Sequence, residues 1–108
     1  PDVAYMRAEH RARRRAEFWD GADLVVEVVS PGGEARDQIE KRADYAAAGI
    51  AEYWIVDPQH RSVEVLRLHG DAYALHAYND GAGTITAATL EGVSIDLASL
   101  FAPDVDAR

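Results

Sequence analysis

The acidic residue Glu27 lies inside an apolar run, "LVVEVV", that has the composition of a buried strand. An ionised carboxylate in such a strand is energetically costly unless a cation, a hydrogen-bond donor or a metal compensates its charge. We therefore expect a compensating group close to Glu27. The alternative is that Glu27 lies near the end of its strand, where it reaches solvent or pairs with an arginine.

Two further residues could take part in this compensation. One is an acid that would share a proton or a metal ion with Glu27, and the other is a lysine that carries a positive charge. Asp2 belongs to a separate short strand, and two carboxylates held side by side imply a shared proton or a metal ion. Lys41 is the only lysine of the chain, and it lies about two turns into a predicted helix, so its long side chain can reach back toward Glu27. The competing interpretation is an exposed helical pair between Asp37 and Lys41, which contributes only a few tenths of a kcal/mol.

The elements that must position these residues follow from hydrophobic periodicity and turn residues. Apolar residues on both faces of the strand around Glu27 are typical of a central strand. Pro31 and the two glycines after it end this strand, and Gly49 is a suitable stop for the helix that follows. A strand–helix–strand unit followed by hairpins predicts a mixed sheet with a helix on one face. The predicted strands cover residues 2–7, 22–30, 51–58, 61–70, 71–78, 83–89 and 93–97, the helix covers 34–48, and a helical turn closes the chain at 97–101.

Composition restricts the class of protein. With 108 residues, of which 48% are hydrophobic and 28% charged, the chain has the size and balance of one soluble globular domain. No apolar run approaches the ~20 residues of a membrane span, and nothing resembles a signal peptide. Cysteine is absent, which excludes disulfides and thiolate metal sites. These features fit a cytoplasmic protein that has no membrane partner.

Charge is distributed unevenly along the sequence. The formal net charge of −8 argues against non-specific binding of nucleic acid. Five of the eleven basic residues nevertheless lie within nine positions, and a basic segment on an acidic body can meet a phosphate backbone. The simpler interpretation is a solvated loop or surface helix. This basic segment consists of Arg7, Arg11, Arg13, Arg14 and Arg15.

An ordered set of motifs over residues 1–58 resembles the family of putative restriction endonucleases within the PD-(D/E)XK nuclease superfamily. The set is fairly specific as a whole, although "VVEVVSP" alone is a common kind of strand and turn. It consists of "PDV" at the beginning, "DLVVEVVSP" at 23–31, the spaced residues Asp37, Glu40, Lys41, Tyr45 and Gly49, and "EYW.VDP" at 52–58.

The resemblance implies a fold of the α+β or α/β class, a restriction-endonuclease-like mixed β-sheet with a flanking helix and a divalent-metal site at the strand ends. Members of the family carry a helix and at least one strand before the "PD" element, and this chain lacks them. We therefore expect residues 1–108 to be a single nuclease-like domain that forms the C-terminal major part of a longer domain. A missing strand would leave an exposed sheet edge, which favours a homodimer.

The resemblance also implies residue roles in a Mg²⁺-dependent endonuclease that hydrolyses DNA, with Mn²⁺ as a substitute. Asp2 matches the aspartate of the "PD" element and Glu27 the acid of the "(D/E)XK" element. Together with the backbone carbonyl of Val28, they would bind the metal. Val29 replaces the lysine expected two places after the acid, and Lys41 matches a lysine that has moved to the following helix.

The remaining roles are assigned to residues around these ligands. Lys41 would orient or deprotonate the attacking water, or stabilise the developing negative charge. Glu40 and Asp37 are candidates for contacts around the metal ligands. The basic segment would contact DNA phosphates, which positions the DNA without reading its sequence.

Two alternatives to the enzyme stay open. One is a catalytically inactive nuclease-like domain that binds DNA or a protein partner, and the other is an oligomerisation module in which the carboxylates form ion pairs. The aromatic residues Tyr45, Tyr53 and Trp54 are predicted to lie in the core, with base stacking as the alternative. The response to metal would separate the enzyme from the two other hypotheses.

Overall fold

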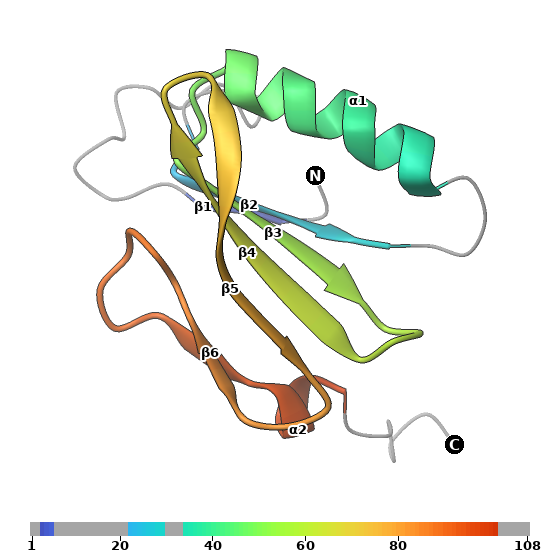
Figure 1. Cartoon of the computed structure of the whole chain (residues 1–108). Coiled ribbons are helices and arrows are strands. Elements are labelled where there is room, and N and C mark those ends of the chain that lie inside the picture. The colour runs from blue at the N-terminus through green and yellow to red at the C-terminus, as the bar shows by residue number, and fades with distance from the viewer. Residues whose placement is uncertain (1–2, 6–21, 30–33, 102–108) are drawn as a thin grey trace.

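The computed structural model describes residues 3–5, 22–29 and 34–101, and these ranges contain seven strands and two helices (Figure 1). None of the described helices is long and apolar enough to cross a membrane. The strands are β1 (Val3–Tyr5), β2 (Leu24–Val28), β3 (Glu52–Asp57), β4 (Ser62–His69), β5 (Ala72–Asp80), β6 (Thr84–Thr86) and β7 (Ser94–Asp96), and the helices are α1 (Glu34–Ala47) and α2 (Leu97–Leu100).

Five of the strands form one mixed sheet in the order β1-β2-β3-β4-β5. β2 and β3 run parallel because α1 returns the chain between them, and the other neighbouring strands are antiparallel. The register places Val26 between Val3 of β1 and Trp54 of β3, so β2 is an interior strand. The predicted strand–helix–strand unit and the mixed sheet with a helix on one face are confirmed.

The two faces of the sheet belong to separate hydrophobic clusters, because successive residues of a strand point to opposite faces. Val25 of β2 joins the cluster under α1, whereas its neighbour Leu24 joins the cluster on the opposite face. Figure 1 shows α1 across one face of the sheet and β6 with α2 on the other side. The cluster under α1 consists of Ala22, Val25, Tyr45, Ile50, Tyr53, Ile55 and Leu66, and the opposite cluster of Leu24, Trp54, Val56, Val63, Val65, Ile85, Leu90 and Leu97.

The three aromatic residues predicted for the core are buried there, since Tyr45, Tyr53 and Trp54 are each at most 2% exposed. Under α1 the tyrosine rings form an edge-to-face row. The ring of Tyr53 lies 5.1 Å from that of Tyr45 and 5.6 Å from that of Tyr73, with interplanar angles of 76° and 65°. Such contacts add about 0.5–1.5 kcal/mol each to the burial of the rings. The row therefore holds the last turns of α1 firmly against the sheet.

Helix α1 ends in a Schellman motif that also fixes Tyr45. Gly49 has a φ of 75°, a conformation that glycine adopts without steric cost. The N–H of Gly49 donates to the carbonyl of Ala46 at 3.0 Å, and the N–H of Ile50 donates to the carbonyl of Tyr45 at 3.1 Å. Ile50 and Tyr45 are both buried in the cluster under α1, which completes the motif. The predicted stop at Gly49 is confirmed.

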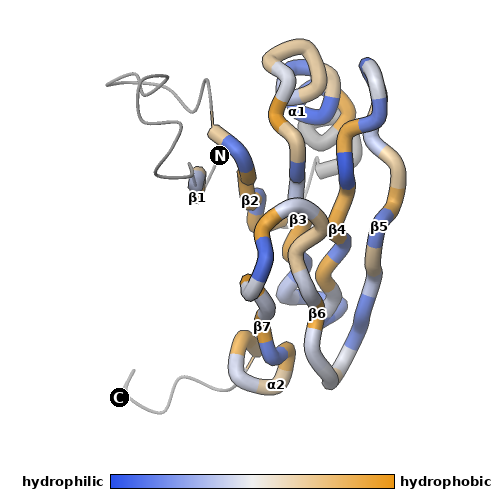
Figure 2. Tube along the Cα trace, turned by 90° about the vertical axis from the view of Figure 1, so that its left-hand side faces the viewer, coloured by the Kyte–Doolittle hydropathy of each residue, from blue (hydrophilic) through white to orange (hydrophobic). Residues whose placement is uncertain are grey.

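The second half of the chain follows the predicted meander. β4 and β5 form a hairpin, and hydrophobic and hydrophilic residues alternate along β4 except at Val65 and Leu66 (Figure 2). The register shifts within this hairpin, since Val65 pairs with Ala77 while Leu66 pairs with Leu75. β6 and β7 pair as a separate two-stranded sheet, and α2 is the expected closing helical turn.

Candidate active site

Glu27 lies near the C-terminal end of β2, on the face of the sheet that α1 covers. Its side chain is only 8% exposed. The residue beside it on β3 is the apolar Ile55, so the neighbouring strand offers no side-chain donor at this level of the sheet. The side-chain donors described for this carboxylate come from above the sheet, on the helix.

Two side chains of α1 contact the two oxygens of the Glu27 carboxylate. The Lys41 ammonium lies 2.9 Å from Oε1 and forms a salt bridge with it. The Tyr45 hydroxyl donates a hydrogen bond to Oε2. Residues four apart lie one above the other on a helix face, which explains how both reach the same acid. The compensating group expected near Glu27 is thus present, and among the described residues its charged member is Lys41.

Lys41 and Tyr45 differ strongly in their exposure to solvent. The Lys41 side chain is 37% exposed, so its aliphatic part lies along the protein while its amine remains close to water. Tyr45 is 2% exposed and lies deeper under the helix. The acid is consequently approached by a cation from the solvent side and by a neutral hydroxyl from the interior.

The two valines after Glu27 have different environments. The Val28 side chain is 44% exposed. Val29 packs against the cluster under α1, and its N–H donates to the Val56 carbonyl at 2.8 Å. The position at which the motif would place a strand lysine is therefore apolar here, and the amine that contacts Glu27 comes from the helix.

Several predicted site residues lie outside the described part of the chain. These are Asp2, the whole basic segment and the side chain of Asp37. The residue after Asp2, Val3, pairs with Val26, which directly precedes Glu27. Glu40 is described and lies exposed on α1.

A second buried acid, Glu52, has surroundings of another kind. It is fully buried at the beginning of β3. Its carboxylate accepts hydrogen bonds from Trp54 Nε1 at 2.6 Å, from the Ala88 N–H at 2.8 Å, and from the N–H and hydroxyl of Thr89 at 2.9 and 2.8 Å. These donors fasten the segment after β6 to the sheet. Glu52 is therefore a structural anchor on the face opposite to Glu27.

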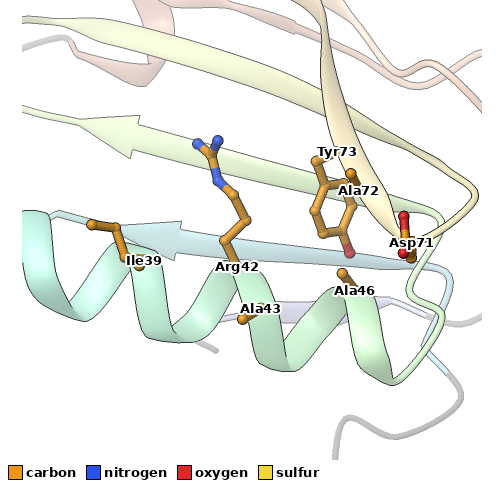
Figure 3. Close-up of a pocket in the computed structure, with 7 residues that line it drawn as sticks. All are labelled: Ile39, Arg42, Ala43, Ala46, Asp71, Ala72 and Tyr73. Carbon is orange, nitrogen blue, oxygen red and sulfur yellow. The ribbon is translucent and has the colours of Figure 1, made fainter.

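A pocket of about 610 Å³ lies on the other side of α1 (Figure 3). The helix forms one wall, and the beginning of β5 with the turn before it forms the other. The Tyr73 hydroxyl donates to the Ile50 carbonyl at 2.6 Å, and burial, with a smaller contribution from Tyr53, raises the pKa of Tyr73. Glu27, Lys41 and Tyr45 do not line this pocket. The described residues that do are Ile39, Arg42, Ala43, Ala46, Asp71, Ala72 and Tyr73.

Comparison with known protein families assigns the chain to one family. Residues 1–98 match the Uma2 family, which is described as putative restriction endonuclease. The chain belongs to the Uma2 family. No curated protein matches it in sequence.

A solved structure supports the fold of this Uma2 chain. The crystal structure of a putative nuclease belonging to DUF820 from Anabaena variabilis aligns with a TM-score of 0.56 over 74% of the chain, at 15% sequence identity. The Uma2 chain spans 44% of the length of that structure. Its five-stranded mixed sheet with a flanking helix is therefore a restriction-endonuclease-like fold.

The donor chemistry around Glu27 fits a hard divalent cation. Carboxylate and carbonyl oxygens are ligands of Mg²⁺, which often uses only one or two protein carboxylates and otherwise keeps water. No group of three or more His, Cys, Asp or Glu side chains that could hold a metal is present among the described residues of the Uma2 chain.

The sequence places Tyr45 in the family motif and in the core, with base stacking as the alternative, and does not predict its contact with Glu27. The spacing of Lys41 and Tyr45 is the signal that could have revealed it, since both positions lie on one helix face. No pattern in the sequence predicts the role of Glu52. Its backbone partners Ala88 and Thr89 follow 36 and 37 residues later and are brought to it only by the fold.

Proposed function

We propose that this Uma2 chain is a Mg²⁺-dependent endonuclease that hydrolyses DNA phosphodiester bonds. The observation that supports the proposal best is the 2.9 Å contact between the Lys41 ammonium and the Glu27 carboxylate. It joins an acid at the end of an interior strand to the only lysine of the chain. The family and the nuclease-like fold supply the context in which such a pair acts on a phosphodiester.

The metal ligands in this proposal are Asp2, Glu27 and the backbone carbonyl of Val28. Asp2 is included because of its place in the motif and because its neighbour Val3 pairs with Val26, the neighbour of Glu27. When bound, Mg²⁺ would supply a Lewis acid for the phosphate and lower the pKa of a coordinated water. The carboxylate of Glu27, shielded from bulk water, is held ready for this task by its two donors on α1.

Lys41 is proposed as the group that stabilises negative charge. As a salt-bridge partner of a carboxylate, its amine carries a proton, so it acts as a donor rather than as a base. During hydrolysis a water oxygen forms a bond to phosphorus, one P–O bond of the DNA backbone breaks, and the leaving oxygen takes up a proton. A cation beside the phosphoryl oxygens lowers the energy of that transition state.

Metal titration tests the proposal directly. Mg²⁺ or Mn²⁺ should raise the melting temperature of the wild type, because a ligand that binds only the folded state stabilises it, by about 2.7 kcal/mol at a hundredfold excess over its Kd. Glu27→Ala should abolish this increase. Glu91→Ala is the matched control, since it removes an exposed acid from a turn after β6.

Cleavage is measured separately, by nicking of supercoiled plasmid. Lys41→Ala should lose nicking activity while it still responds to the metal. Equal cleavage by wild type and Lys41→Ala would remove Lys41 from the proposed mechanism. If millimolar Mg²⁺ and Mn²⁺ leave the melting temperature of the wild type unchanged, the enzyme is ruled out for this chain, and an ion-paired binding or oligomerisation module is favoured instead.

A further inference from the structure

Tyr45 contacts the proposed metal ligand through a side chain that has almost no freedom of its own. Its hydroxyl donates to Oε2 of Glu27, and the residue is 2% exposed. The partner oxygen Oε1 is contacted by Lys41 from the preceding turn of the same helix. Each oxygen of the carboxylate therefore has a donor that comes from the same helix.

The Tyr45 ring and backbone are both fixed. The ring meets Tyr53 edge-to-face at 5.1 Å, and the backbone carbonyl accepts the N–H of Ile50 in the Schellman motif. Because these contacts already fix the Tyr45 side chain, little further conformational entropy is lost when its hydroxyl donates to Glu27.

We propose that Tyr45 is a positioning residue, which holds the Glu27 carboxylate in the orientation that binds the divalent metal. This inference rests on the proposed function, in which Glu27 is a metal ligand. Groups that hydrogen-bond to ligating carboxylates typically change metal affinity by 10- to 100-fold when they are removed. One hydrogen bond to a carboxylate oxygen does not prevent coordination, because each oxygen has two lone pairs.

The decisive substitution is Tyr45→Phe, which removes the hydroxyl and keeps the ring in its contact with Tyr53. Binding of Mn²⁺ alone is measured by isothermal titration calorimetry, well below the melting temperature, so that a loss of stability does not enter the Kd. We expect the Kd for Mn²⁺ to rise by about tenfold or more. A value within twofold of the wild type would overturn the proposal.

Tyr73→Phe is the matched control. It removes a hydroxyl from the same row of tyrosines, but that hydroxyl donates to the Ile50 carbonyl and not to Glu27. We expect its Kd for Mn²⁺ to stay within twofold of the wild type. Equal weakening in both variants would show a general loss of packing and would contradict a specific role of Tyr45.

Two further results keep the inference separate from the function on which it rests. If the wild type gives no binding heat with Mn²⁺, the metal site itself is wrong and the positioning role fails with it. If the wild type binds and Tyr45→Phe binds equally well, only the positioning role fails. Should Tyr45→Phe not fold, Glu27→Asp withdraws the carboxylate from the hydroxyl by one methylene, and an unchanged Kd in that variant would also overturn the proposal.

Discussion

Glu27 and Glu52 are both buried acids, but their side chains have different surroundings. The Glu52 carboxylate is surrounded by neutral donors of the backbone and of side chains, on the face away from α1. Glu27 is contacted by a cation whose side chain is 37% exposed and by one buried hydroxyl. A solvent-facing ammonium can move to meet an incoming phosphate, whereas a closed set of neutral donors has no such freedom. For this reason the proposed chemistry is assigned to Glu27.

The salt bridge of Glu27 gives a prediction about stability. Lys41→Met should destabilise the fold by about 1–2 kcal/mol, because it leaves a shielded carboxylate without its cation. Urea unfolding measures this change. Arg42→Met is the control, since it removes a neighbouring cation from the exposed surface of the same helix. Adding Glu27→Gln to Lys41→Met should restore most of the loss, and equal losses in Lys41→Met and Arg42→Met would contradict the prediction.

Asp57 gives a prediction about pH. The side-chain hydrogen bond with His60, whose Nδ1 lies 2.7 Å from Oδ2, is the main cause that lowers the pKa of Asp57 below its ordinary value of 3.8. A lowered pKa in the folded state contributes stability above pH 3.8, and this contribution is lost as the pH falls through the folded value. His60→Ala should therefore destabilise at pH 5–6 by less than about 1 kcal/mol, since the pair is exposed.

The difference between wild type and His60→Ala should shrink at pH values well below 3.8. His69→Ala, which changes an exposed histidine at the end of β4, is the control. Thermal unfolding at a series of pH values gives the comparison. A difference between wild type and His60→Ala that grows on acidification would show that the sign of the linkage is wrong.

At the scale of elements, the helix rather than the strand delivers the amine to the acid. β2 ends within two residues of Glu27, and Val29 packs into the cluster under α1. The helix crosses back over this strand, and its Schellman motif stops it at Gly49, so that Lys41 and Tyr45 lie above Glu27. The position of α1 on the sheet therefore determines the geometry of the site.

The attachment of β6 and β7 to the sheet depends on Glu52. Glu52→Gln should destabilise the fold by about 2–4 kcal/mol, because its amide group would replace an acceptor oxygen and face the donors of Trp54, Ala88 and Thr89. Trp54 donates to Glu52 directly, so its fluorescence should report the change during chemical denaturation. Glu91→Gln is the control at an exposed turn, and a loss as small as that of the control would refute the anchoring role.

The sequence predicts those parts of the molecule that depend on local patterns. The strand around Glu27, the helix that ends at Gly49 and the reach of Lys41 toward the acid all follow from periodicity and spacing within 30 residues, and the structure contains each of them. The contacts of Glu52 could not be predicted, because its partners come from a segment placed by tertiary packing alone. The contact of Tyr45 with Glu27 lies between these two cases. The spacing of Lys41 and Tyr45 places both on one helix face, but an aromatic residue in a helix most often packs in the core.

At the scale of the whole molecule, the proposed function requires an acidic protein to bind an anionic substrate. The net charge of −8 opposes DNA at long range, so a local excess of arginine is needed for binding. The basic segment is the strongest such excess in the sequence, and it lies outside the described residues. Its contribution can be measured without knowledge of its structure.

Salt dependence gives that measurement. Arg13→Gln with Arg14→Gln should reduce the slope of log K for DNA against log salt by up to about 0.9 for each arginine that contacts a phosphate. Arg61→Gln with Arg67→Gln is the control, because it removes the same charge from two exposed positions at and before β4. Fluorescence anisotropy with a labelled duplex provides the affinities. Equal slopes in the two double variants would exclude the basic segment as the phosphate contact.

Helix α1 carries two separate sets of side chains, and this has a mechanical consequence. Lys41 contacts Glu27, whereas its neighbour Arg42 lines the pocket beside β5, since successive residues leave a helix about 100° apart. Both side chains belong to the same helix of 14 residues, so the pocket and the acid share one supporting element. A bulky side chain at Ala46 that widened the pocket would also shift the ammonium away from the carboxylate.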